Sequence, residues 1–197
     1  MPGFRLLSVA LAVFATVCDD LAAQSAQPIS LQVSGLFNGV FGQVFTGLGD
    51  GVGGEAQVRY TPGALSIGAG FQYTNHGLQA REEDARLYGG FVEPRYRIHA
   101  GSNVVAPYLS ARFSVLKVGF SGGELSLSSA FIQLNGGGGL LFRVGPRVNL
   151  DVGGTFGYDR LGAGTLRNRA TGSAVATESG SGSNIVARVG LAVGLGG

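Results

Sequence analysis

Charged residues alternate along one short stretch of the chain, "GGFVEPRYRI" at residues 89–98. Glu93, Arg95 and Arg97 share one parity, and Pro94 and Tyr96 fall on the other, so the charges lie on one face of a strand. Carboxylate and guanidinium groups placed in this way can form hydrogen-bonded ion pairs or line a path for ions. Buried charge is costly unless it is paired. The stretch therefore raises the question of which face of its sheet is enclosed.

Catalytic chemistry finds little support in the sequence. His76 with Glu82, Glu83 and Asp84 is the one histidine–carboxylate cluster, and its spacing matches no motif. A solvated polar loop is the simpler interpretation, and His99 falls in a short turn at the opposite end of the expected fold. No metal-ligand spacing is present. We therefore expect a protein that is not an enzyme and that has no cofactor and no metal.

The composition describes an extended, weakly charged chain. It has 197 residues, which suggests one domain. Glycine accounts for 36 residues, and charged residues make up only 13%, about half of the usual ~25%. The formal charge of +2 is too small to indicate nucleic-acid binding. These values favour closely approaching strands.

The N-terminus has the pattern of a secretory signal. Arg5 supplies a positive charge, and Leu6–Val17 is an apolar core followed by small residues. This core is shorter than the ~20 residues that a spanning helix needs. We predict a signal peptide over residues 1–26, cleaved near 23–26, and a barrel domain over residues 28–197. A lipid anchor on Cys18 and a buried N-terminal helix are the alternatives.

Alternation with period two dominates the chain after Pro28. The pattern predicts eight strands. Their expected ranges are Ile29–Phe45, Glu55–Thr61, Leu65–Thr74, Arg86–Ile98, Val104–Phe120, Ser128–Arg143, Arg147–Asp159 and Asn184–Leu195.

Short and long connections alternate between these strands. Residues 61–64, 99–103 and 144–147 are tight-turn sequences, whereas residues 46–54, 75–84, 121–127 and 160–183 are longer and polar or glycine-rich. Tight turns at one end and longer loops at the other are typical of bacterial outer-membrane barrels. The fold class expected is all-β, an eight-stranded antiparallel up-and-down transmembrane β-barrel that follows an N-terminal signal peptide.

One parity of each strand is nearly all apolar, and the other is small and polar. A soluble barrel would expose many charged residues, about 25–35% of its surface, whereas here the polar parity is mostly Gly, Ser, Asn and Gln. Small residues suit the inside of an eight-stranded barrel. Aromatic residues also fall at strand ends, as in the girdles of a membrane barrel. Those beside the short turns are Tyr60, Tyr96 and Phe142, and those beside the long loops are Phe45, Tyr73, Tyr88, Phe120 and Tyr158.

An inward polar face would place a charged network in the lumen. Its expected members are Gln57, Arg59, Gln72, Glu93, Arg95, Arg97, Arg112, Gln133, Asn135, Asn149, Asp151 and Arg188. We expect Glu93 and Asp151 each to contact one or more arginines. The network is either a structural plug or a gate in a narrow ion path, and the plug is the simpler interpretation.

Two backbone features accompany this network. Pro94 cannot donate a ladder hydrogen bond, so we predict a ladder break or bulge there, with Val92, Pro94, Tyr96 and Ile98 facing lipid or the interface. The run Gly136–Gly139 is followed by no helix, so it is no phosphate loop. We expect it to permit curvature or close packing within a strand.

The stretches "GGFVEPRYRI", "VVAPYLSARFSV" and "GGGLLFRVGPRVNLDVGGTFGY" resemble the eight-stranded outer-membrane β-barrel family, which includes the transmembrane domain of outer-membrane protein A. The resemblance covers most of residues 28–197. It implies a barrel in the outer membrane of a Gram-negative-type cell, surrounded by outer-membrane lipid and inserted by the barrel-assembly machinery.

The expected function is a structural or surface-interaction role in the outer membrane, carried by loops 75–84 and 160–183 of a monomer. The surface partner cannot be named from the sequence. A narrow pore for small solutes is one alternative, and a secreted soluble calyx for a hydrophobic ligand is another.

Overall fold

The computed structural model describes residues 28–78, 84–120, 125–168 and 170–195. The signal peptide expected over residues 1–26 and Cys18 lie outside these ranges, as do Glu82 and Glu83. Among the described residues, no helix is long and apolar enough to cross a membrane.

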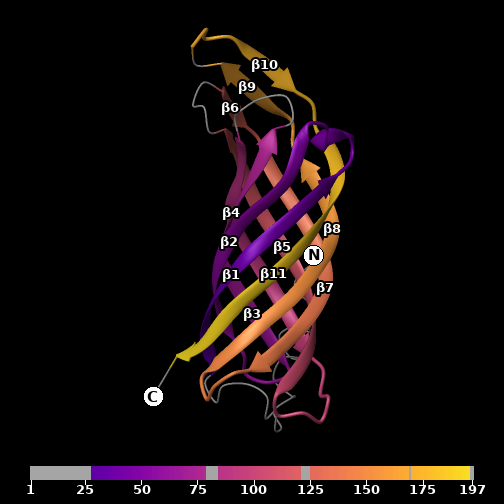
Figure 1. The fold of residues 1–197 in the computed structure, drawn as a ribbon. Coiled ribbons are helices and arrows are strands. Elements are labelled where there is room, and N and C mark those ends of the chain that lie inside the picture. Colours follow the sequence, from indigo (N-terminus) through magenta and orange to yellow (C-terminus); the bar gives the residue numbers. More distant parts are fainter. Residues whose placement is uncertain (1–27, 79–83, 121–124, 169, 196–197) are drawn as a thin grey trace, which may run out of the picture.

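Eight strands close into an antiparallel barrel in the order β1-β11-β8-β7-β5-β4-β3-β2, which confirms the expected all-β, eight-stranded antiparallel barrel (Figure 1). Barrel neighbours follow one another along the chain, so the meander is up-and-down. The bounds are β1 (Ile29–Phe41), β2 (Leu48–Tyr60), β3 (Leu65–Leu78), β4 (Asp84–Arg97), β5 (Val105–Phe120), β7 (Ala130–Arg143), β8 (Val148–Leu161) and β11 (Gly180–Leu195).

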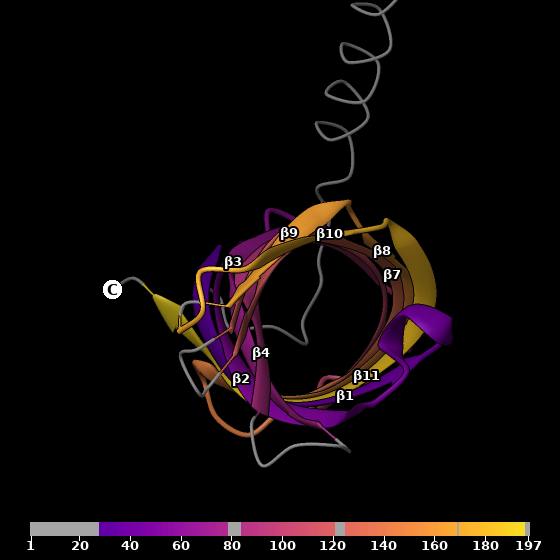
Figure 2. The same ribbon diagram turned by 90° about the horizontal axis from the view of Figure 1, so that it is seen from above.

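The first and last strands complete the ring. β1 pairs with β11 without interruption from Ile29 opposite Leu195 to Phe41 opposite Ser183. Figure 2 shows the ring from above. Because β1 also pairs with β2, and β11 with β8, every barrel strand has two partners and the wall has no open edge.

A second, smaller sheet stands beyond one end of the barrel (Figure 1). It consists of β6 (Leu125–Ser128), β9 (Gly164–Asn168) and β10 (Ala174–Thr177), in the order β10-β9-β6. The expectation of plain loops at 121–127 and 160–183 is therefore wrong in these parts. The strands are too short to show a clear alternation, and they form by pairing with one another. We call this end the loop end and the opposite end the turn end.

The predicted loop 46–54 is largely strand, which is a second correction. β1 ends at Phe41, a single turn of 3-10 helix η1 (Gln43–Phe45) follows, and β2 already begins at Leu48. The glycines of 47–54 hid the alternation because they carry no side chain. Glycine is required at position 53 because the backbones of β2 and β3 approach closely there. A Cβ at Gly53 would overlap the backbone carbonyl of Tyr73. The predicted loop 75–84 likewise begins as strand, because β3 extends to Leu78.

Pro94 interrupts one ladder but makes no bulge. Between β4 and β5, the pairs Val92 opposite Phe113 and Arg95 opposite Ser110 have the same register, and no pair is formed at residues 93 and 94. Pairing with β3 continues through Ile67 opposite Pro94. The predicted break is present, whereas the alternative of a bulge is wrong, because the strand simply spans the missing donor.

The glycine run of β7 lies mid-strand, as expected, and permits close approach. A Cβ at Gly137 would overlap the carbonyl of Gly154 on β8, and one at Gly138 would overlap the carbonyl of Tyr108 on β5. The two neighbouring strands therefore lie close to β7 on both sides.

Candidate functional site

Glu93 of β4 is the centre of a charged cluster inside the barrel, with none of its surface exposed. Arg188 of β11 donates to its two carboxylate oxygens, with Nη2–Oε1 2.6 Å and Nη1–Oε2 2.8 Å. Arg95 Nε lies 3.2 Å from Oε1, and Arg59 Nη2 lies 3.4 Å from Oε2. In the ring, three strands separate β4 from β11 in either direction. The bidentate pair of Glu93 and Arg188 therefore crosses the lumen.

Asp151 of β8 is the second anion of this cluster. Its Oδ2 is 2.9 Å from Arg95 Nη1 and accepts a hydrogen bond from Gln32 Nε2 at 2.7 Å. The Tyr108 hydroxyl donates to Asp151 Oδ1 at 2.6 Å and accepts from Arg188 Nη2 at 3.0 Å. The Arg95 guanidinium also lies 4.5 Å from the centre of the Tyr108 ring. Five strands thus meet at Asp151 through direct contacts or through one shared partner.

A second layer lies nearer the loop end. Glu55 of β2 forms an ion pair with Arg112 of β5, with Nη1–Oε2 2.6 Å. Arg112 Nη2 donates to Gln72 Oε1 at 2.6 Å, and Gln72 Nε2 donates to Gln133 Oε1 at 3.2 Å. The Arg112 guanidinium also stacks 3.5 Å from the centre of the Phe91 ring. The contacts of Arg112 with Glu55 and Gln72, and of Gln72 with Gln133, again join strands that are not neighbours in the wall.

Amides fill a third layer. Asn135 and Asn184 exchange hydrogen bonds across β7 and β11, and Asn184 also donates to Asp159 of β8. Towards the loop end, His76 is buried with its ring nitrogens 3.0 Å from Thr74 Oγ1 and 3.0 Å from the Gly49 carbonyl oxygen.

The histidine–carboxylate cluster considered from the sequence does not form between His76 and Asp84, its two members in the described part of the chain. His76 points into the barrel, whereas Asp84 belongs to the outward parity of β4 and accepts a hydrogen bond from Asn75 at 2.7 Å. The two side chains lie on opposite faces of the wall, because successive residues of a strand point to opposite faces of its sheet.

Arg97 is also buried, yet it stands apart from the ion-pair cluster. Its Nη2 donates to the Gly63 carbonyl oxygen at 2.6 Å, at the turn that joins β2 and β3. Arg97 therefore caps the turn end of the lumen. Asn149, another expected lumen residue, is buried as well.

Apolar side chains gather at the loop end of the lumen instead. Val40, Phe45, Leu87, Leu116 and Phe131 form a buried cluster, which we call the mouth cluster. Phe45 and Phe131 meet edge to face with ring centres 5.7 Å apart. Phe45 was expected among the outward aromatic residues, and this expectation is wrong. The turn of η1 brings its ring inward, and only 8% of the residue remains exposed.

The other aromatic residues expected at the strand ends form two rows on the outside. Tyr60 and Tyr96 are exposed near the turn end, where Phe142 is half-buried, and Tyr73, Tyr88 and Tyr158 are exposed towards the loop end. The side chain of Phe120 lies outside the described part of the chain. Tyr73 and Tyr88 are direct partners in the register, and β3 and β4 both continue beyond them. The rows therefore lie within the wall and bound a band of it.

The band between the two rows is uniformly apolar. At the outward positions of the described strands there, only glycine, alanine, proline, valine, leucine, isoleucine and phenylalanine occur. From Tyr88 to Tyr96 the band covers about 26 Å along the strand, at about 3.3 Å per residue. A strand tilt of 35–45° reduces this to about 20 Å, close to the apolar height of outer-membrane barrels.

Sequence reasoning overlooked several members of the lumen network. Glu55, Tyr108, Asp159, Asn184 and Gln32 are all buried and bonded there. Their parity was the available signal: Glu55 shares the face of Gln57 and Arg59, and Tyr108 shares the face of Arg112.

No protein-family model and no curated relative matches this chain. Solved structures do. Neisserial surface protein A is 21% identical with a TM-score of 0.66, over 85% of this chain and 97% of that one. A major outer membrane protein of Thermus thermophilus is 17% identical with a TM-score of 0.55, over 85% and 98%. The outer membrane protein OprG of Pseudomonas aeruginosa is 9% identical with a TM-score of 0.53, over 88% and 98%.

These similarities cover nearly the whole length of each of the three proteins, and at these identities they concern the fold. They agree with the closed ring of eight strands described above. The chain therefore has the eight-stranded antiparallel barrel fold of outer-membrane proteins.

Proposed function

We propose that this chain is an integral outer-membrane protein with a structural or surface-interaction role, whose lumen is closed by its own side chains. The apolar band between the two aromatic rows carries the proposal. A wall of this kind is costly in water, since exposed apolar area is unfavourable by about 25 cal/mol per Å². In a bilayer the same wall is favourable, and a closed barrel pairs its strands with one another all round, without an open edge.

The distribution of side chains opposes a soluble calyx. A calyx for a hydrophobic ligand needs an apolar interior and a polar exterior. Here the interior holds Glu93, Arg95, Asp151 and Arg188, all nearly or completely buried, while large apolar side chains such as Phe156 and Val189 are exposed outside. The arrangement is the inverse of a calyx.

The lumen network favours a plug over a pore. Ion pairs between non-adjacent strands, Glu93 with Arg188 and Glu55 with Arg112, cross the space that a solute would need. An eight-stranded barrel leaves a lumen that side chains can fill. The mouth cluster adds an apolar layer at the loop end. Solute passage would require several buried ion pairs to separate, which is energetically costly.

The loop-end sheet supports a surface role. β6, β9 and β10 project beyond the barrel, and Val175 of β10 is 63% exposed although it is apolar (Figure 1). Outer-membrane barrels place their longer loops outside the cell. We assign any contact with another molecule to this sheet and its loops.

Fractionation of cells that express the full chain tests the membrane assignment. We expect the protein in the outer-membrane fraction, extracted only with detergent, and migrating differently on gels before and after boiling. A protein that stays in the aqueous phase without detergent would refute the assignment.

Planar-bilayer recording then separates a plug from a pore. We expect no regular conductance steps from the wild-type barrel. Steps that change when Glu93 is replaced by Gln would establish the pore instead. Glu178→Gln, at an exposed position beyond the barrel wall, is the matched charge control.

A further inference from the structure

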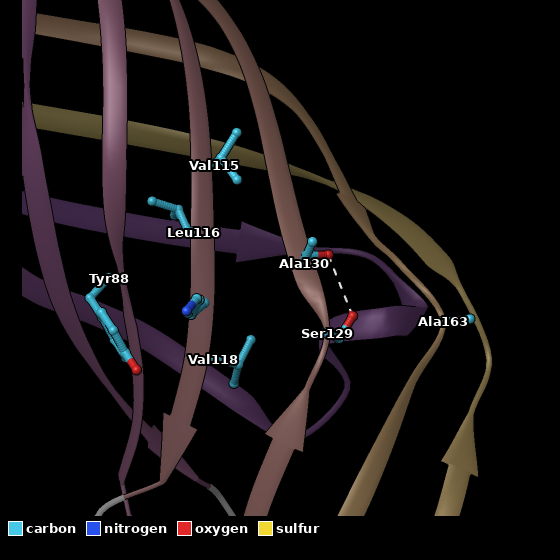
Figure 3. A pocket seen from close by; sticks show the side chains of 8 residues that line it. Tyr88, Val115, Leu116, Val118, Ser129, Ala130 and Ala163 are labelled. Carbon is cyan, nitrogen blue, oxygen red and sulfur yellow. Dashed lines mark hydrogen bonds between the residues drawn. The ribbon is translucent and has the colours of Figure 1, made fainter.

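Two adjoining hollows lie on the outer wall over β4 and β5. The first, of about 370 Å³, is bordered by Ala69, Gly90, Val92, Phe113 and Val115. The second, of about 490 Å³, lies nearer the loop end. It is bordered by the outward residues Tyr88, Val115 and Lys117, and its floor includes Leu116 and Val118 of the inward parity. Ser129, Ala130 and Ala163 complete its border. Figure 3 shows Tyr88, Val115 and Val118 along β4 and β5 in the second hollow. Val115 borders both hollows, so they adjoin along β5, and together we call them the track.

The first hollow exists because Gly90 has no side chain. Gly90 faces outward and lies opposite Val115 in the register. A Cβ built there would meet only the Gly70 carbonyl oxygen at 3.7 Å, an ordinary contact, so the space above it is open. Its outward neighbours Val92 and Phe113 are apolar and about half exposed. The hollow lies between the aromatic rows, at the depth of lipid chains.

The second hollow has a cation where the apolar band ends. Lys117 is the single lysine of the sequence. It is exposed and lies opposite Tyr88 of the loop-end aromatic row. Arg86, also exposed, lies one outward position further along β4, opposite Gly119. The ammonium group of Lys117 and the guanidinium group of Arg86 therefore lie at the level where the acyl chains of a bilayer meet its head groups.

We propose that this track binds a phosphorylated lipid of the surrounding leaflet. One acyl chain lies over Gly90, and the phosphate accepts charge-assisted hydrogen bonds from Lys117 and Arg86. Lys117 lies two residues beyond Val115, about 7 Å along the strand, so the charged and apolar parts are contiguous. A free phosphate ion would not need the apolar hollow. The inference rests on the proposed membrane function.

Native mass spectrometry of the detergent-solubilised full barrel tests the proposal. The probe is phosphatidic acid, compared with diacylglycerol of the same chains and with inorganic phosphate. We expect one molecule of phosphatidic acid to be retained in preference to diacylglycerol, and inorganic phosphate not to displace it. Loss of a charge-assisted hydrogen bond in Lys117→Gln should weaken retention by about tenfold or more.

Filling the first hollow tests the acyl half of the site. Gly90→Leu should weaken binding of long-chain phosphatidic acid by about tenfold, because the leucine occupies the chain's position. Short-chain phosphatidic acid should be affected less. Gly35→Leu is the matched control, because a Cβ at Gly35 on the opposite wall meets only the Val189 carbonyl oxygen at 3.9 Å. Arg147→Gln, an exposed position at the turn end, controls for net charge.

The outcomes separate this proposal from the membrane assignment. Heat-dependent gel mobility shows whether each variant forms the barrel. A wild-type chain that never enters detergent overturns the membrane assignment. A chain that enters detergent but binds diacylglycerol as well as phosphatidic acid overturns the lipid site alone. Equal losses in Lys117→Gln and Arg147→Gln, or in Gly90→Leu and Gly35→Leu, would also overturn it, since binding would then be non-specific.

Discussion

The middle of the lumen and its mouth fill the same barrel in opposite ways. In the middle, Glu93 and Asp151 share the guanidinium groups of Arg95 and Arg188. In the mouth cluster, Leu87, Leu116 and Phe131 pack without polar partners. The inward parity of a strand is therefore not polar throughout. Every second side chain still points into the lumen, but these side chains are charged in the middle of the barrel and apolar at its mouth.

The two layers should therefore lose stability in different ways when one side chain is replaced. A buried ion-pair network is stable only when its charges balance, so removing one member leaves others uncompensated. An apolar cluster loses mainly the buried area and packing of the side chain that is removed. Substitutions in each layer test this contrast. Stability is measured as the free energy of unfolding of the barrel in vesicles, with circular dichroism as the signal of unfolding.

The largest loss is expected for Glu93→Gln. Arg59, Arg95 and Arg188 would all lose their shared carboxylate, which should lower stability by about 3–5 kcal/mol. Glu178→Gln should change it by less than about 0.5 kcal/mol, as exposed substitutions usually do. A Glu93→Gln loss as small as that of the control would mean that the network is not held by its charges.

Leu116→Ala in the mouth cluster should have the next largest effect. Leu116 is fully buried, and removing its methyl groups should cost about 3 kcal/mol through lost burial and a residual cavity. Leu116→Met keeps the volume and should cost less than about 1.5 kcal/mol. Equal losses in the two variants would contradict a layer held by apolar packing.

A double-mutant cycle on Glu55 and Arg112 should sharpen the contrast. The two side chains are in contact in the second layer. The double variant Glu55→Gln with Arg112→Gln should lose less stability than the two single variants lose together, by about 1–2 kcal/mol. The same cycle on Leu87 and Arg112 should give a smaller coupling. Additive losses at Glu55 and Arg112 would show that the pair does not act as a unit.

The smallest effect is expected for Pro94→Ala. Pro94 lies between Glu93 and Arg95 but faces outward, and the ladder gap beside it is on the β5 side. A new backbone donor there would be offset by greater freedom of the unfolded chain, so stability should change by less than about 1 kcal/mol. A larger loss would mean that the proline itself fixes the charged layer.

Much of the architecture could be predicted from alternation. The apolar parity of residues such as Val189 and Leu191 predicted the outward wall, and the opposite parity of Glu93 and Arg95 predicted the enclosed one. Alternation is visible because lipid on one side and a narrow lumen on the other impose different side chains at every second residue.

The remaining features depend on contacts that parity does not show. The start of β2 was obscured by glycines, at which neighbouring backbones approach too closely for a side chain. Glu55 was the first residue of the predicted strand and was overlooked although it shares the parity of Gln57 and Arg59. Phe45 follows a helical turn rather than a strand, so alternation did not indicate its inward position. β9 and β10 form from pairing between segments that have little pattern of their own.

The pairing of β1 with β11 also has a consequence for assembly. Ile29 and Leu195 become neighbours only when the last strand reaches the first. Contacts between such distant parts of a chain form slowly. Until they form, β1 and β11 each expose a row of unpaired backbone groups, which can pair with another chain. Completion of the ring is therefore the step at which this molecule is most exposed to aggregation, and substitutions that weaken β11 should lower the yield of barrels more than the stability of those that close.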